Sequence, residues 1–164
     1  MKKQFKSGYA YLIICCLIML VLFISSSQTY EQQNSVPFLE NWLPGEPFKE
    51  SLSSIEFSYA NSVVSIKTMG YAKFIEFFIR KGAHFFTFFV LGGSLFLVLK
   101  PKLKPVYLVA IISWFSATGY AAMDEFHQML TGGRTPLFQD VMLDSSGALT
   151  ACVVLLIWFL VRKK

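Results

Sequence analysis

The sequence is poor in charged residues and in cysteine. Only 15% of its 164 residues are charged, against about a quarter in an ordinary soluble domain, so the composition excludes that class of protein. Its three cysteines, Cys15, Cys16 and Cys152, lie inside apolar runs, and their spacing predicts neither a disulfide framework nor a zinc site. Cys15 and Cys16 do not mark a lipoprotein signal, because the apolar run continues past them to Ile24.

Motifs that carry chemistry in many enzymes are also missing. The sequence has no G-x-S-x-G elbow, no glycine-rich loop that would cradle a phosphate and no H-E-x-x-H pair. No cofactor is therefore expected, no metal ligand is assigned, and the sequence identifies no catalytic residue.

The chain is instead rich in long apolar runs. Hydrophobic residues make up 54% of the sequence, aromatic residues 16%, and the mean hydropathy is +0.51. Four runs are each close to the roughly 20 residues that cross a bilayer as a helix, at about 8–26, 82–99, 106–123 and 141–161. These runs predict an all-α membrane protein with a single domain over 1–164, built as a four-helix transmembrane bundle.

The basic residues are concentrated beside these runs. Nine of the 15 stand in three segments without any acidic residue: Lys2, Lys3 and Lys6; Lys100, Lys102 and Lys104; Arg162, Lys163 and Lys164. This distribution follows the positive-inside rule and argues against nucleic acid as the partner of a chain with net charge +5. It predicts that both termini are cytoplasmic and that the loop at 28–79 is external.

Two parts of this topology have alternatives. The first run also resembles a cleaved secretory signal, but it is long for one and lacks a clear A-x-A site, so a membrane span is favoured. Within the external loop, the stretch "GYAKFIEFFIRKGAHFF" predicts a helix that either lies at the membrane interface or runs directly into the second span.

The predicted topology gathers charged and polar residues at the extracytoplasmic edge of the bilayer. Helical spacing aligns three stripes, which comprise Lys81, His84, Phe85, Phe88 and Gly92; Tyr120, Asp124, His127 and Gln128; and Asp140, Asp144, Gly147 and Ala151. The candidate site residues are Arg80, Lys81, His84, Asp124, Glu125, Gln128, Arg134, Asp140 and Asp144. A turn at Gly132 and Gly133 is expected to aim Arg134 at an anionic group.

This cluster admits three interpretations. Its basic side chains could pair with its carboxylates and only tie the helix ends together, which costs little near the interface. The same groups could bind a lipid headgroup or an antibiotic, which is the interpretation we favour. A metal site that uses His84, His127 and the carboxylates is disfavoured, because no recognised ligand spacing is present and the basic groups compete for the carboxylates.

Two motifs resemble those of the VanZ-like membrane family. "RKGAHFFTFFVLG" and "DEFHQMLTGGRTPLFQDVMLDSSGA" match its paired signatures at Lys81, His84, Phe85, Phe88, Asp124, Glu125, Gln128, Gly133, Arg134, Asp140, Val141, Asp144 and Gly147. One departure is Ala151, where members often have a second glycine. The resemblance implies a small multi-span protein of a bacterial cell membrane, and the family's namesake is associated with low-level resistance to teicoplanin.

Together these observations give two hypotheses about function. The first is a cell-envelope protein, not demonstrably an enzyme, whose polar pocket binds a lipid headgroup, a lipid-linked wall precursor or a glycopeptide and contributes to teicoplanin-type resistance. The alternative is a membrane-embedded hydrolase or transferase, with or without a metal, that acts on a lipid-linked substrate, because His84 would lie near several carboxylates. Neither the ligand nor the oligomeric state follows from the sequence.

Overall fold

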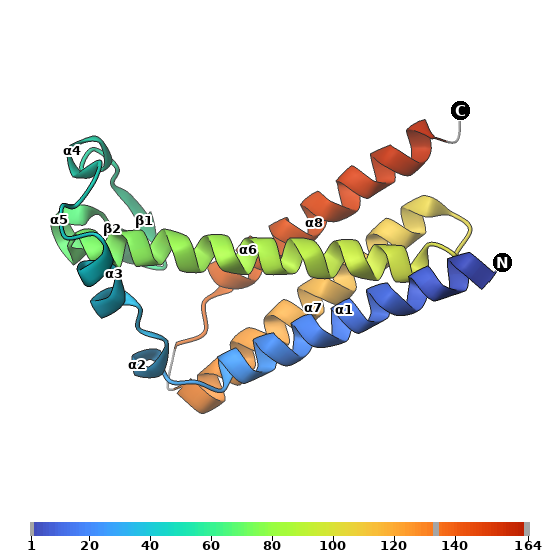
Figure 1. Ribbon diagram of the computed structural model, residues 1–164, viewed down its shortest axis with the longest axis horizontal. Coiled ribbons are helices and arrows are strands. Elements are labelled where there is room, and N and C mark those ends of the chain that lie inside the picture. Colours follow the sequence, from blue (N-terminus) through green and yellow to red (C-terminus); the bar gives the residue numbers. More distant parts are fainter. Residues whose placement is uncertain (1, 133–134, 163–164) are drawn as a thin grey trace.

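Four long helices dominate the computed structural model, which describes residues 2–132 and 135–162 (Figure 1). They are α1 (Lys2–Ser26), α6 (Tyr71–Leu99), α7 (Val106–Gly132) and α8 (Phe138–Val161). Each contains a segment long and apolar enough to cross a membrane: Gly8–Ser26, Tyr71–Leu99, Val106–Thr131 and Phe138–Val161. This confirms the predicted all-α membrane protein with four spanning helices.

The helices run alternately up and down, so the connections gather at two ends. The start of α1, the α6–α7 connection and the end of α8 lie at one end of the molecule (Figure 1). The segment between α1 and α6 and the connection between α7 and α8 lie at the other. The connection between α6 and α7, with Lys100, Lys102 and Lys104, is thus separated by the length of the bundle from the start of α8, which carries Asp140 and Asp144.

All four helices are longer than the spans expected from hydropathy, α6 and α7 by the most. The helix containing the span at 82–99 starts at Tyr71 and has 29 residues, and α7 continues beyond residue 123 to Gly132. The apolar windows mark only the part suited to hydrocarbon, whereas the helical backbone continues beyond it. The stretch from Tyr71 therefore runs directly into the second span, and the loop expected over 28–79 ends at Gly70, whose φ of +83° suits glycine.

The segment between α1 and α6, residues 27–70, forms a small lobe. It contains α2 (Tyr30–Gln33), α3 (Val36–Trp42), α4 (Lys49–Leu52), β1 (Phe57–Tyr59), β2 (Ser62–Val64) and α5 (Ile66–Met69). The two strands pair antiparallel around Ala60 and Asn61, which both have positive φ, as tight hairpin turns require. Val64 and Ile66 pack on Phe74 of α6, so the lobe is attached to the extended start of that helix.

Small residues allow α6 and α8 to approach closely. A Cβ atom added at Gly92 would lie 2.8 Å from Cα of Ala148, and one added at Gly147 would overlap the carbonyl oxygen of Phe85. Such contacts are typical of membrane helices, where small side chains permit close packing. The α6 and α8 stripes predicted from the sequence therefore lie face to face, and α1 packs on α6 and α7.

Candidate functional site

The charged residues of the three later helices lie at one depth, near the end of the bundle that carries the lobe. Arg80 stands about 20 residues, or about 30 Å, from the far end of α6 at Leu99. Glu125 lies about as far from the start of α7, and Val141 about as far from the end of α8. About 30 Å is also the thickness of a hydrocarbon core, so these residues stand one membrane thickness along the helices from their far ends.

Lys81, Asp140 and Tyr59 join α6, α8 and the lobe at this depth. Lys81 Nζ donates to Asp140 Oδ1 at 2.5 Å, and the Tyr59 hydroxyl donates to the same oxygen at 2.5 Å. The Lys81 ammonium also lies 4.9 Å from the centroid of the Tyr59 ring, a cation–π distance. Burial first, and then the Asp140 carboxylate, raise the pKa of Tyr59, so its hydroxyl stays protonated and donates.

One helical turn further into the bundle, His84 and Asp144 form a second pair between α6 and α8. His84 Nδ1 lies 3.2 Å from Asp144 Oδ2. The Asp144 side chain is 6% exposed and that of His84 is 29% exposed, so the carboxylate is the deeper member. The close approach of Gly147 to Phe85 immediately below fixes how near these two side chains lie.

Helix α7 contributes carboxylates with different partners. Glu125 Oε1 accepts a 2.7 Å hydrogen bond from the backbone N–H of Leu137, which holds the chain that leads into α8. Gln128 Nε2 donates to Asp124 Oδ2 at 3.1 Å, and both side chains are buried. Glu125 therefore shapes the connection, whereas Asp124 lies below it in the packed interior.

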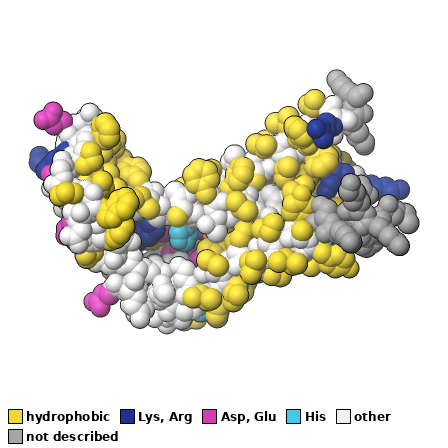
Figure 2. Space-filling model, viewed as in Figure 1, with side chains coloured by type: hydrophobic (Ala, Val, Ile, Leu, Met, Phe, Trp, Pro, Cys, Tyr) yellow, Lys and Arg dark blue, Asp and Glu magenta, His cyan; other side chains and the backbone are white. Residues whose placement is uncertain are grey.

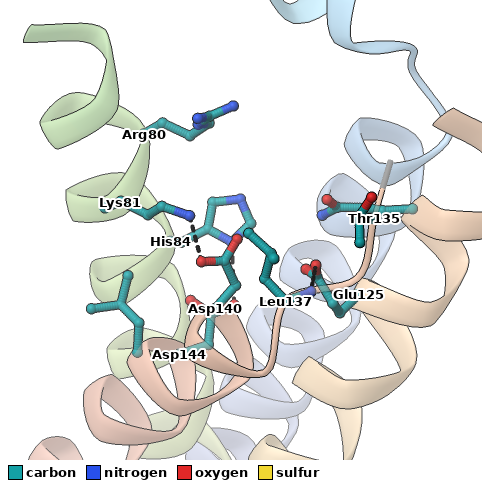
Figure 3. Close-up of a pocket in the computed structure, with 10 residues that line it drawn as sticks. Arg80, Lys81, His84, Glu125, Thr135, Leu137, Asp140 and Asp144 are labelled. Atoms are coloured by element: carbon teal, nitrogen blue, oxygen red, sulfur yellow. Dashed lines mark hydrogen bonds and ion pairs between the residues drawn. The ribbon is translucent and has the colours of Figure 1, made fainter. Parts of the chain in front are cut away.

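These helix ends enclose a pocket of about 230 Å³. It is lined by Arg80, Lys81, His84, Glu125, Gln128, Thr135, Leu137, Asp140, Leu143 and Asp144. Figure 2 shows charged and histidine side chains in a hollow between the lobe and the apolar body of the molecule. In Figure 3 the labelled side chains of α6 face those of α8 across it. The lining thus combines two basic groups with three carboxyl groups in a small volume.

Most of the predicted site residues meet at this pocket, with two exceptions and one difference of orientation. Asp124 is adjacent but does not line it, and Arg134 falls outside the described residues, so its role stays a prediction. His127, which shares the predicted α7 stripe, turns toward α1 instead. Its Nδ1 lies 2.8 Å from the Ser26 hydroxyl and its ring stacks on Phe23.

Sequence reasoning missed Tyr59, Thr135 and Leu137. Thr135 and Leu137 belong to the connection before α8, and their position between two predicted helices could have suggested them. Tyr59 had no such signal, because its contact with Asp140 depends on how the lobe folds against α6. Within residues 2–132 and 135–162, no group of three or more His, Cys, Asp or Glu side chains is arranged to hold a metal ion.

The chain was also compared with known proteins. The family model described as VanZ/LLP1 matches residues 11–160, which include most of each spanning helix and every residue that lines the pocket. No curated protein and no solved structure matches the chain significantly. The matched region therefore contains both the helical bundle and the candidate site.

Proposed function

Because the chain belongs to the VanZ/LLP1 family of proteins, we propose that it is a bacterial cell-membrane protein whose pocket binds the polar headgroup of a membrane amphiphile. The pocket opens on the extracytoplasmic side, and both termini are cytoplasmic. The ligand is a phospholipid, a lipid-linked wall precursor or a lipoglycopeptide, and binding contributes to teicoplanin-type resistance. These ligands share a polar headgroup and an apolar anchor.

The basic residues support this orientation. The connection that carries Lys100, Lys102 and Lys104 lies at the opposite end of the bundle from the pocket (Figure 1). Basic segments are retained in the cytoplasm during insertion, which leaves the lobe and the pocket on the outer side.

The observation that carries the proposal is the pocket's position about 30 Å along the helices from their basic end, a distance equal to the thickness of the hydrocarbon core. A lipid headgroup is charged and lies at the edge of the hydrocarbon core, where Arg80, Lys81 and the facing carboxylates of the pocket would meet it. Ionisable groups are costly in a membrane and usually serve a function. Within this lining, Lys81 is paired with Asp140.

Filling the pocket tests the proposal. Thr135 is exposed and lines the pocket, so Thr135→Trp should obstruct it without disturbing the core. We expect native mass spectrometry of the purified protein to show at least about a tenfold loss of retained lipid. Ser54→Trp, at an exposed position on the lobe, is the matched control. Unchanged lipid retention and unchanged teicoplanin susceptibility in Thr135→Trp cells would contradict the proposal.

A second candidate function rests on the contact between His84 and Asp144. A carboxylate that holds one imidazole nitrogen orients the ring for general-base catalysis at the other nitrogen. A hydrolase or transferase acting on a lipid-linked substrate would use this pair. Incubation with radiolabelled lipid-linked precursor tests it: the wild-type protein would form a product that His84→Gln does not, and metal analysis of both would identify a metal-dependent reaction.

A further inference from the structure

The carboxylate of Asp144 has one oxygen that the contacts among the described residues do not satisfy. The residue is 4% exposed, and its Oδ1 atom has no hydrogen-bond partner among residues 2–132 and 135–162. The other oxygen, Oδ2, faces His84 Nδ1 at 3.2 Å. Asp144 nevertheless lines the pocket, so its carboxyl group lies beside the space that a bound molecule would fill.

A buried carboxylate oxygen without a donor is unfavourable. Leaving such a group unsatisfied costs more than an ordinary hydrogen bond contributes, because the group has lost its water. Asp144 cannot easily turn away, since the backbones of α8 and α6 are in contact at Gly147 and Phe85, within one turn of it. A ligand that donates a hydrogen bond to Oδ1 would remove this cost.

The charges around Asp144 indicate the kind of donor. Among the described residues, three carboxyl groups line the pocket against two basic groups, and one of these basic groups, Lys81, is paired with Asp140. A cationic donor therefore suits Asp144 better than a neutral one. Arg80 and Lys81 on the same lining disfavour a bare polycation, so the cation should belong to a molecule that also carries an anionic group.

We propose that the pocket binds an ammonium group with at least one N–H, which donates a hydrogen bond to Asp144 Oδ1, on a ligand that also carries a phosphate. An ethanolamine phospholipid has this chemistry, and so does soluble phosphoethanolamine. The inference rests on the proposed function, because it names the chemical class of the headgroup bound at the same site.

Successive N-methylation of the headgroup gives a direct test. A single acceptor oxygen needs only one N–H, so the mono- and dimethylated headgroups keep the hydrogen bond. The trimethylated choline headgroup keeps the positive charge but has no N–H to donate. We expect wild-type protein in nanodiscs to retain phosphatidylethanolamine and its dimethyl form about tenfold or more better than phosphatidylcholine or phosphatidylglycerol. Equal retention of all four lipids overturns the inference.

Two variants assign the preference to Asp144. Asp144→Asn removes the charge and should abolish the roughly tenfold preference for ethanolamine over choline. Glu50→Gln removes a carboxylate of similar chemistry from an exposed position on α4 and should keep it. The methylation series on the wild-type protein decides the matter if Asp144→Asn fails to fold. Persistence of the preference in a folded Asp144→Asn protein overturns the inference.

The same measurements separate this inference from the proposed function. If Thr135→Trp reduces lipid retention but the wild type retains all four lipids equally, a headgroup binds but the ammonium assignment is wrong. If Thr135→Trp changes nothing, both proposals fail. Soluble phosphoethanolamine tests the source of the ammonium group. If it displaces bound lipid, the site accepts the group from either source. If it binds while the protein retains no lipid, the ligand is a soluble amine.

Discussion

The Tyr59 hydroxyl and the Asp140 carboxylate, 81 positions apart, form a 2.5 Å hydrogen bond between the lobe and α8. Lys81 donates to the same carboxylate oxygen from α6. A single side chain thus fastens the lobe and two spanning helices beside the pocket. The position of the lobe and the shape of the pocket are therefore coupled, and the coupling can be tested through each of the three groups.

Tyr59→Phe should loosen the lobe while leaving the bundle intact. The variant keeps the ring that contacts Phe77 and Lys81 but loses the hydrogen bond to a charged acceptor, worth about 1 to 2 kcal/mol. Amide hydrogen exchange of β1 and β2 should accelerate about 5- to 30-fold. Tyr107→Phe, at an exposed position on α7 far from the lobe, should leave these rates unchanged.

The same hydrogen bond predicts a dependence on pH. The pKa of Tyr59 is raised in the folded protein, so its contribution to stability is complete below the ordinary tyrosine pKa of about 10 and is lost as the pH rises above that value. The difference in Tm between the wild type and Tyr59→Phe should be constant from pH 7 to 9 and shrink above about pH 10. A difference that grows with pH would contradict this assignment.

The facing stripes of α6 and α8 could be predicted because they depend on local spacing. Residues three and four apart share a helix face, and the topology brings both faces to one end, so Lys81 and His84 meet Asp140 and Asp144. The same rule could not decide the direction of His127. His127 shares a wide helix face with Asp124, and only the position of α1 shows that its side chain points away from the pocket, toward Ser26.

The contacts of the lobe and of the bundle interior could not be predicted from the sequence. Tyr59 reaches Asp140 through a hairpin whose docking depends on tertiary packing rather than periodicity. Within the bundle, Ser145 Oγ accepts from Trp114 Nε1 at 2.9 Å and lies 2.8 Å from Thr118 Oγ1. Sequence spacing gives no indication of such pairs, because they depend on how α7 and α8 are rotated about their axes.

The Lys81–Asp140 pair should be strongly coupled. Both side chains are mostly buried, 15% and 22% exposed, so removing one partner leaves the other charge poorly solvated. We expect Lys81→Met and Asp140→Asn each to lower the free energy of unfolding in micelles by about 2 to 3 kcal/mol. The double variant should cost about 1 to 2 kcal/mol less than the sum of the two.

The chain contains a control for this cycle. Lys49 and Glu46 form an ion pair of the same length, 2.5 Å, but their side chains are 48% and 43% exposed. Water screens such a pair, so its coupling should be about 0.5 kcal/mol or less. Equal coupling in the two cycles would show that the burial of Lys81 and Asp140 has no effect.

The orientation in the membrane can be tested with single cysteines. Glu50→Cys lies on the lobe and Lys102→Cys on the connection at the opposite end, and both positions are exposed. In a background with Cys16→Ala, a membrane-impermeant thiol reagent should label Glu50→Cys in intact cells and Lys102→Cys only after lysis. The reverse pattern would place the pocket on the cytoplasmic side and remove the basis for binding an outer-leaflet headgroup.

Gly147 should tolerate no larger side chain, because its contact with α6 is made by the backbone. A methyl group there would overlap the carbonyl oxygen of Phe85, so the helices must separate, at a cost of about 1 to 3 kcal/mol. Gly147→Ala should therefore lower the Tm and, by moving His84 away from Asp144, reduce retention of the bound lipid. Gly119→Ala is the matched control, since nothing lies within 4 Å of an added Cβ there, and it should leave both quantities unchanged.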